Sequence, residues 1–444
     1  MIVRLTLACV VLAIALGMLR TREYRRWFRL PTQRTDALPA ALAGAVIPLH
    51  LERDGFVVPA ATPLPGRTVL LELRVRAALL GRLFDPFIEL ACGDVRQRQY
   101  FERGASGQRL LDLSPCFHGT ATPTAARVHL AGGRLRWQRE ATLHVFEPPV
   151  LAERNVMIFA PHPDDAEIAA FGLYATHRSW VVTITAGERG GGVPVIDIPH
   201  EECWQWAALL RVADSLSVPQ LGRVTAERCV NLAYPDGALE RMRREPSLPF
   251  QLACEPGLPR AQLRAMNAQP GFRACPPCTW NHLVGELRQL LELAQPDIIV
   301  CPHPLLDKNV DHIHTTRAVA LALRASSGLA PLLLLYAVHH PGAPVHPHGP
   351  ATAMSGVPPH DGASWLADSL YSHLLAPRLR MAKLLAVENM HGVRANRLPA
   401  VAQIRGWLAG LGTDPTSFLR RAPRPTEMYY VLSPGRLSEL VGSG

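Results

Sequence analysis

Residues 156–167 read VMIFAPHPDDAE, an apolar run that passes directly into a group of polar residues. The first five residues are typical of a strand buried on both faces, and a helical pattern begins at Ala166. His162, Asp164 and Asp165 therefore stand where a strand ends and a helix begins. Binding sites of open α/β sheets form at this end of the strands. The stretch predicts a metal site in which one carboxylate binds the ion and its neighbour faces a bound water.

Further strands and helices alternate along the chain after this stretch. The buried-strand patterns cover 180–185 and 298–301, and the helical patterns cover 204–216, 283–293 and 315–324. Strands that alternate with helices indicate a parallel sheet. We therefore expect a Rossmann-like α/β domain with a mostly parallel sheet over residues 150–444. Residues 238–281 and the Pro-, Gly- and His-rich residues 340–364 are expected to be irregular.

A second polar segment follows the strand expected at 298–301. Residues 301–314 read CPHPLLDKNVDHIH. If this strand lies beside the first one in the sheet, a histidine from this segment completes a His-Asp-His set. Three protein ligands and a water are the pattern of catalytic zinc, which lowers the pKa of its water and polarises a carbonyl.

Several motifs resemble those of the PIG-L/LmbE-type N-acetylglucosaminyl deacetylases. Residues 161–167, PHPDDAE, resemble the signature of that family. The resemblance continues over about 153–395, through motifs at Thr185–Glu188, Arg211 to Gly222, Tyr234–Gly237 and 296–312. It does not extend to residues 1–150.

The resemblance implies a role for individual residues. The zinc ligands would be His162, Asp165 and His312, and Asp164 would be the general base. Residues near the sugar hydroxyls would be Glu188, Arg211 and Asp236, and we group Lys308, one of only two lysines, with these substrate-binding residues.

The chain departs from the family pattern at Asn309, where the family often has histidine. Asparagine can donate a hydrogen bond to an oxyanion but cannot supply a proton near neutral pH. We therefore expect Asn309 to steady the oxyanion and Asp164 to act as both base and acid. His303 and His314 are the alternative acids. Two further departures are Ala186, in place of an acidic residue, and Asp214, in place of glutamate.

The function expected from this resemblance is zinc-dependent removal of the N-acetyl group from an N-acetylhexosamine. We expect the sugar to belong to a glycolipid or to a lipid-linked or cell-surface glycan precursor. Two alternatives stay open: a catalytically degenerate protein that binds glycan, and a zinc amidase that acts on another N-acyl substrate.

The sequence pattern of residues 49–149 differs from that of the rest of the chain. Short apolar and alternating stretches are separated by clusters of Gly, Pro and Asp. Regular short strands of this kind predict a β-sandwich domain.

The N-terminus carries an apolar run from Ile2 to Leu19, followed by arginines at 20, 22, 25, 26 and 29. The run predicts a transmembrane anchor over residues 1–30, followed by a linker over 31–48. The arginines favour a single-pass protein of the inner membrane with a cytoplasmic catalytic domain, so the membrane is an expected partner. Export to the periplasm after cleavage of a signal peptide is the alternative.

Composition excludes several classes of protein. The chain of 444 residues is 48% hydrophobic and 19% charged, which excludes a disordered chain. The net charge is +9, but we find no basic stripe with interleaved aromatic residues, so we expect no nucleic-acid partner. Three alternatives stay open for Cys254, Cys275 and Cys278: free thiols, a disulfide, or a structural zinc site.

Overall fold

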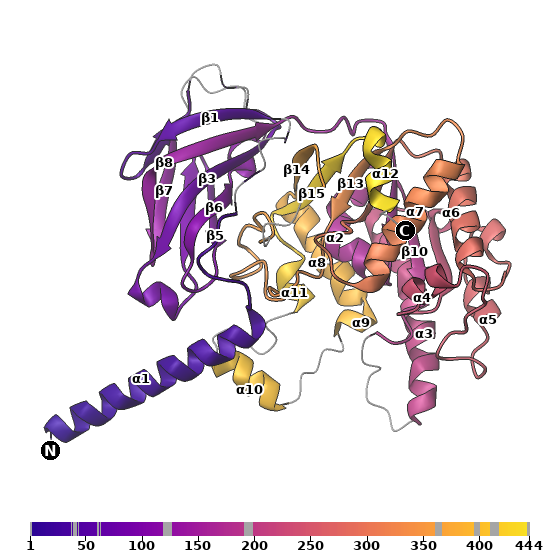
Figure 1. The fold of residues 1–444 in the computed structure, drawn as a ribbon, viewed down its shortest axis with the longest axis horizontal. Coiled ribbons are helices and arrows are strands. Elements are labelled where there is room, and N and C mark those ends of the chain that lie inside the picture. The colour runs from indigo at the N-terminus through magenta and orange to yellow at the C-terminus, as the bar shows by residue number, and fades with distance from the viewer. Residues whose placement is uncertain are drawn as a thin grey trace.

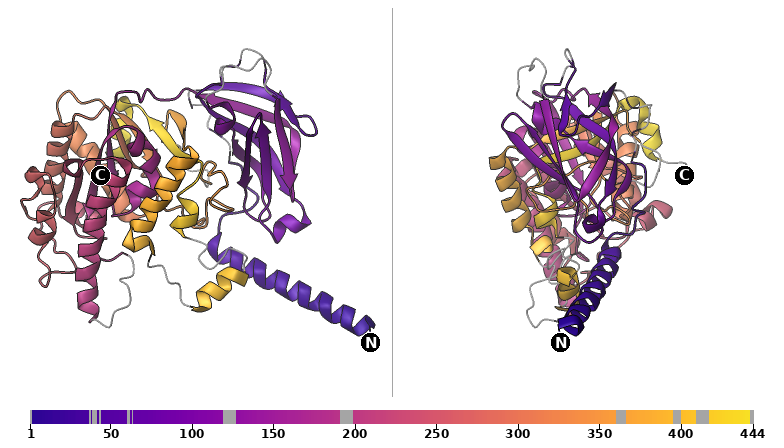
Figure 2. Two further views of the ribbon diagram at one scale, coloured as in Figure 1. Left: turned by 180° about the vertical axis from the view of Figure 1, so that it is seen from behind. Right: turned by 90° about the vertical axis from the view of Figure 1, so that its left-hand side faces the viewer.

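The computed structural model describes residues 2–36, 38, 42, 44–59, 62, 64–118, 127–190, 199–359, 366–394, 400–408 and 417–441. Figure 1 shows an N-terminal lobe of strands beside a larger C-terminal lobe of strands and helices. The long helix α1 (Ile2–Trp27) extends away from both lobes, as Figure 2 shows from two further directions.

The N-terminal lobe consists of two four-stranded antiparallel sheets. The strands of the first sheet are, in order, β1 (Ala45–His50), β8 (Leu135–Phe146), β3 (Thr68–Ala77) and β6 (Ser106–Asp112). The strands of the second are β2 (Gly55–Val57), β7 (Arg127–Gly133), β4 (Phe87–Cys92) and β5 (Val95–Tyr100). Alternate residues of each sheet point into one shared hydrophobic core, as Val69, Leu71, Leu73 and Val75 do from β3. The strands begin at Ala45, inside the segment expected to be a linker.

The C-terminal lobe is built on a mixed sheet of seven strands, and the expectation of an α/β fold is confirmed. Their order is β11 (Cys229–Tyr234), β10 (Arg178–Thr185), β9 (Asn155–Ala160), β12 (Ile298–Pro302), β13 (Leu332–Tyr336), β15 (Thr426–Leu432) and β14 (Ser369–Leu374). The first five strands are parallel, and β15 is antiparallel to both of its neighbours. The parallel strands are buried along almost their whole length, as strands covered on both faces are.

Helices connect and cover these strands. They are α2 (Asp165–Thr176), α3 (His200–Ser217), α4 (Leu239–Arg244), α5 (Arg260–Ala265), α6 (Trp280–Ala294), α7 (Val310–Ala325), α8 (Pro377–Asn389), α9 (His391–Arg394), α10 (Ala400–Leu408), α11 (Phe418–Arg421) and α12 (Leu437–Val441). Short 3₁₀ turns lie at Leu79–Arg82, Ser114–Phe117, Val218–Gly222, Ala226–Arg228, Pro270–Phe272 and Pro434–Arg436. The helix α2 packs on β9, β10 and α8, and α7 packs on β12 and α6.

Buried polar contacts join the two lobes. The hydroxyl of Thr68 on β3 accepts a hydrogen bond from the backbone nitrogen of Ser372 on β14 at 2.8 Å. The Ser372 hydroxyl donates to the carboxylate of Asp112 on β6, also at 2.8 Å. Burial raises the pKa of Asp112. The outer face of the first N-terminal sheet is therefore attached to the C-terminal lobe at the Asp112 end of β6.

The expected N-terminal membrane anchor is wrong. Among the described residues, the structure contains no helix whose length and hydrophobicity would let it cross a membrane. The last turns of α1 carry Arg20, Arg22, Arg25 and Arg26, and Tyr24 between them is only 1% exposed because it packs into the protein. The assignment to the inner membrane is corrected with it.

Candidate metal centre

Two connections at the carboxyl ends of neighbouring strands bring the expected ligands together. His162 lies between β9 and α2, and Asp165 is the first residue of α2. His312 lies in the first turn of α7, which follows β12. Because β9 and β12 are adjacent and parallel, their carboxyl ends meet at one edge of the sheet.

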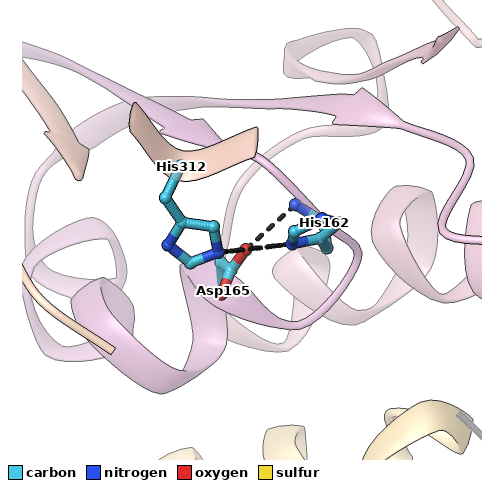
Figure 3. Close-up of side chains that lie close together, drawn as sticks. All are labelled: His162, Asp165 and His312. Carbon is cyan, nitrogen blue, oxygen red and sulfur yellow. Dashed lines mark hydrogen bonds and ion pairs between the residues drawn. The ribbon is translucent and has the colours of Figure 1, made fainter. Parts of the chain in front are cut away.

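The three side chains converge on one point (Figure 3). The Oδ2 atom of Asp165 lies 3.2 Å from Nδ1 of His162 and 3.1 Å from Nε2 of His312. The two ring nitrogens are 3.3 Å apart. His312 and Asp165 are buried, so these atoms are held away from bulk water.

The chemistry of this donor set fits a cation. The other ring nitrogen of His312, Nδ1, lies 2.9 Å from Oδ2 of Asp307, and a carboxylate on one ring nitrogen leaves the other free to bind a metal. Burial lowers the pKa of His312, but the carboxylates of Asp165 and Asp307 outweigh burial and raise it to about 9. The pocket therefore favours positive charge at the point where the three atoms meet. Two imidazoles and one carboxylate are ligands that suit zinc.

A second possible ligand group shares His162. Its Nε2 atom lies 3.4 Å from Asp236 and 3.3 Å from Asp311, and these three residues also satisfy the spacing of a metal site. Both oxygens of Asp311, however, already accept backbone hydrogen bonds, from Gly237 at 2.6 Å and Leu239 at 3.2 Å. Oδ2 of Asp165 also accepts a backbone hydrogen bond, from His162 at 2.9 Å, but His162, Asp165 and His312 offer two imidazoles and so suit zinc better.

Asp164 lies beside the metal ligands in an unusual backbone conformation. Its φ of 131° and ψ of −27° lie in a region that side-chain-bearing residues rarely adopt. Its Oδ2 atom is 3.4 Å from both terminal nitrogens of Arg211. Burial raises the pKa of Asp164 to about 6, although the guanidinium of Arg211 opposes the rise.

The residues expected to contact sugar differ in what their side chains contact. Asp236 lies between His162 and the backbone nitrogen of Arg189, and Arg211 reaches Asp164. Glu188 is buried and accepts hydrogen bonds from the backbone nitrogen of Asp236, so it positions Asp236.

Lys308 is exposed on the loop before α7, and its backbone nitrogen donates to the carbonyl oxygen of His339 at 3.3 Å.

Asn309 is the N-cap of α7. Its Oδ1 atom accepts a hydrogen bond from the backbone nitrogen of Asp311 at 2.9 Å. This contact occupies the amide oxygen and does not use the amide nitrogen.

In each of the two alternative acids, the Nδ1 atom is occupied by a backbone contact. Nδ1 of His303 accepts from the backbone nitrogens of Leu305 and Leu306, each at 3.2 Å, and burial lowers its pKa to about 4. Nδ1 of His314 lies 2.9 Å from the carbonyl of Val310 within α7.

His339 also lies beside the candidate metal centre and was not expected there from the sequence. Its ring centroid lies 4.9 Å from that of His312, and its backbone nitrogen donates to Asp307 at 3.2 Å. His339 follows β13, the strand next to β12, so the carboxyl-end rule that located His162 also applied here. No strand was expected at Leu332–Tyr336, so nothing in the sequence placed His339 after one.

Cys254, Cys275 and Cys278 are all free thiols, and they form no metal-binding group among the described residues.

Comparison with known proteins agrees with the motifs. Residues 157–323 match the PIG-L family, described as GlcNAc-PI de-N-acetylase. No curated protein matches. The chain therefore carries a PIG-L domain over these residues. PIG-L domains are those of deacetylases, which are metal-dependent hydrolases acting on N-acetylated sugars, and the expectation of an enzyme of this class is confirmed.

Solved structures show a slight likeness. The zinc-inhibited form of the teicoplanin deacetylase Orf2 is 17% identical, with 63% of this chain and 98% of that chain covered at a TM-score of 0.32. The N,N'-diacetylchitobiose deacetylase from Pyrococcus horikoshii is 16% identical, with 64% and 85% covered at a TM-score of 0.34. The A40926 pseudoaglycone deacetylase Dbv21 is 15% identical, with 63% and 98% covered at a TM-score of 0.34. This likeness is too slight to bear on the arrangement of the present chain.

Proposed function

We propose that the C-terminal lobe removes the acetyl group from the nitrogen of an N-acetylhexosamine, with one zinc ion held by His162, Asp165 and His312. The observation that carries the proposal is the convergence of these three side chains beside Asp164. A zinc ion in this position would supply a Lewis acid that polarises the amide carbonyl and acidifies water.

Asp164 is the proposed base and acid. Arg211 holds Oδ2 of Asp164 at 3.4 Å, which leaves the other carboxylate oxygen to take a proton from the attacking water. The water oxygen bonds to the carbonyl carbon, the carbon–nitrogen bond breaks, and Asp164 returns the proton to the leaving amine. The products are acetate and the free amino sugar.

Asn309 is the proposed donor to the oxyanion. Because its oxygen caps α7, its amide nitrogen is the group available to donate. Arg211 and Asp236 are proposed to bind sugar hydroxyls, Glu188 to hold Asp236, and Lys308 to contact the substrate.

The division of the chain is part of the proposal. We take residues 49–149 as a β-sandwich domain and residues 150–444 as the deacetylase domain. One hydrophobic core formed by both N-terminal sheets supports the first assignment, and the seven-stranded sheet supports the second.

A glycan-binding protein without activity is the second candidate. The observation that favours it is Asn309, which stands where the family often has histidine and cannot protonate the leaving amine. A zinc amidase for another N-acyl substrate is the third.

The test is acetate release from a panel of compounds, with and without a chelator. The panel contains N-acetylglucosamine, an N-acetylglucosamine disaccharide, a detergent-solubilised N-acetylglucosaminyl glycolipid and an N-acyl amino acid. We expect release from at least one sugar compound, loss with the chelator, and recovery on adding zinc. Binding without release would favour the second candidate, and release from the amino acid alone would favour the third.

A further inference from the structure

A hollow of about 470 Å³ lies on the N-terminal lobe, away from the candidate metal centre. We call it the basic groove. Its exposed side chains are Arg74, Arg76, Arg136, Gln33, Thr35 and Gln138. They come from β3, from β8, and from the segment after α1.

Strand geometry places the three arginines on one face of a sheet. Arg74 and Arg76 are two residues apart on β3, so they point the same way, opposite to the core residues Leu73 and Val75. Arg76 lies directly opposite Arg136 of β8 in the antiparallel register, which puts both side chains on that face.

The three arginines gather positive charge on this face of the sheet. Like charges directly opposite each other destabilise a strand pair. Among the described residues, none of the three guanidinium groups has an acidic partner. The acid two residues along the same face, Glu72, is held by Gln108 at 2.9 Å and by His144 at 3.1 Å. The fold therefore assembles positive charge here without neutralising it.

The opposite wall of the groove supplies neutral hydrogen-bonding groups. Backbone bonds from Arg34 to Ser106 and from Ser106 to Thr32, at 3.1 and 2.9 Å, hold residues 32–36 against β6. The close approach needs Gly107, whose φ is +99° and where a Cβ would lie 2.1 Å from the carbonyl oxygen of Arg34.

Gln33 and Thr35 face outward from this wall. Arg34 between them turns inward, to ion pairs with Asp36 at 2.7 Å and Glu102 at 2.8 Å. The wall therefore adds amide and hydroxyl groups, and no further free charge.

We propose that the basic groove binds an acidic glycan, a sugar chain that carries carboxylate groups. Guanidinium groups bind carboxylates through paired, charge-assisted hydrogen bonds, and the amides and hydroxyl of Gln33, Gln138 and Thr35 suit sugar hydroxyls. Nucleic acid fits less well because single strands are held by stacking on aromatic faces. The aromatic residue of the lining, Trp137, lies opposite Val75 and packs against the core of the lobe.

The basic groove lies on the sheet face that also contacts the C-terminal lobe. The sheet face that carries Arg74 and Arg76 also carries Leu70 and Asp112, which pack against the C-terminal lobe. A glycan held in the groove would lie on the side of the N-terminal lobe that faces the deacetylase lobe. The proposal does not depend on the activity of that lobe.

The test uses the full chain and fluorescently labelled oligogalacturonate, with unlabelled dextran oligomers as the neutral counterpart. The variant is Arg74→Gln/Arg76→Gln/Arg136→Gln. Its matched control, Arg53→Gln/Arg178→Gln/Arg324→Gln, removes the same charge from three exposed arginines elsewhere. We expect the groove variant to weaken binding by at least about tenfold and the control to change it by less than about twofold.

Three outcomes would overturn the proposal. The first is unchanged binding by the groove variant, and the second is an equal loss in the control, which would indicate a diffuse effect of net charge. The third is complete competition by single-stranded DNA of the same length through the same arginines, which would assign the groove to nucleic acid. Circular dichroism of both variants checks that the lobes stay folded.

Discussion

Helix α2 carries two buried polar clusters that differ in how completely their groups are satisfied. At its start, Asp165 faces two imidazole nitrogens that lie 3.3 Å from each other. In its third turn, the backbone nitrogens of Gly172 and Leu173 donate to the carboxylate of Glu427 at 2.8 and 3.3 Å. Lys383 and Tyr429 donate to the same carboxylate at 2.7 and 3.0 Å.

The difference separates a binding site from a structural contact. The cluster around Glu427 contains its own counter-charge and enough donors, so it needs nothing from outside the chain. The cluster around Asp165 brings one carboxylate and two imidazoles together, a donor set that fits an added cation. The same helix therefore has one end at the candidate metal centre and a middle that is fixed to β15 and α8.

The largest expected effect is loss of the metal. His312→Ala removes one of three ligands, so we expect the bound divalent ion to be lost on dialysis, and with it all acetate release. Lys383→Met alters the other cluster and should keep the ion. Metal analysis by atomic emission of both variants tests the contrast, and full occupancy in His312→Ala would remove that residue from the ligand set.

Replacement of the base comes next. Asp164→Asn should keep the ion, because Asp164 is not a proposed ligand, and should lower turnover by roughly 10²–10⁴-fold. The measurement pairs turnover with metal content on the same preparation. Near-normal turnover would show that the proton moves through another group.

The third prediction concerns stability. Lys383→Met leaves the buried Glu427 carboxylate without its cation, so the free energy of unfolding should fall by about 3–5 kcal/mol. The exposed pair of Arg288 and Glu292 has the same 2.7 Å separation, and Arg288→Met should cost under about 1 kcal/mol. Urea unfolding of both variants compares the stability lost from a buried ion pair with that lost from an exposed pair of equal separation. Equal losses would contradict the view that Glu427 depends on Lys383.

Lys383→Met/Glu427→Gln sharpens this prediction. The double variant removes both charges but keeps an oxygen for the α2 nitrogens, so it should recover part of the loss.

The smallest expected effect is at the cap of α7. Asn309→Ala should cost about 1 kcal/mol of stability, whereas Asn309→Asp should cost little because aspartate is an equally good N-cap. Both variants lose the amide donor, so both should lower turnover by a similar factor. If Asn309→Asp keeps normal turnover and only the destabilised Asn309→Ala loses it, the residue only caps the helix.

Local sequence patterns located the residues of one of the two clusters. Strand and helix periodicity placed His162 and Asp165 within five residues of the end of a buried strand and the segment with His312 after a second one. The choice of Asp165 and His312 as ligands came from the resemblance to the deacetylase family. Glu427 lies more than 250 residues from Gly172, and its role depends on β15 entering the sheet between β13 and β14. No periodicity in the sequence encodes that order.

Two other features could not be read from residue type alone. The apolar run from Ile2 to Leu19 resembled an anchor, and hydropathy does not reveal that the same helix continues to Trp27 and packs into the protein at Tyr24. Asn309 was expected only at the oxyanion, although Asn before a helical stretch is also an N-cap signal. In both cases the residue has a structural role, packing for α1 and capping for Asn309, that only its contacts in the folded chain show.

The backbone of Asp164 has a consequence for protein engineering. A residue with a φ of 131° is strained by about 1–3 kcal/mol, and glycine at that position would release the strain. Selection for thermal stability alone would therefore favour Asp164→Gly, a variant that lacks the proposed base. Stability and turnover make opposite demands on this one residue, so a thermostabilised form of this chain should be screened for acetate release at every round.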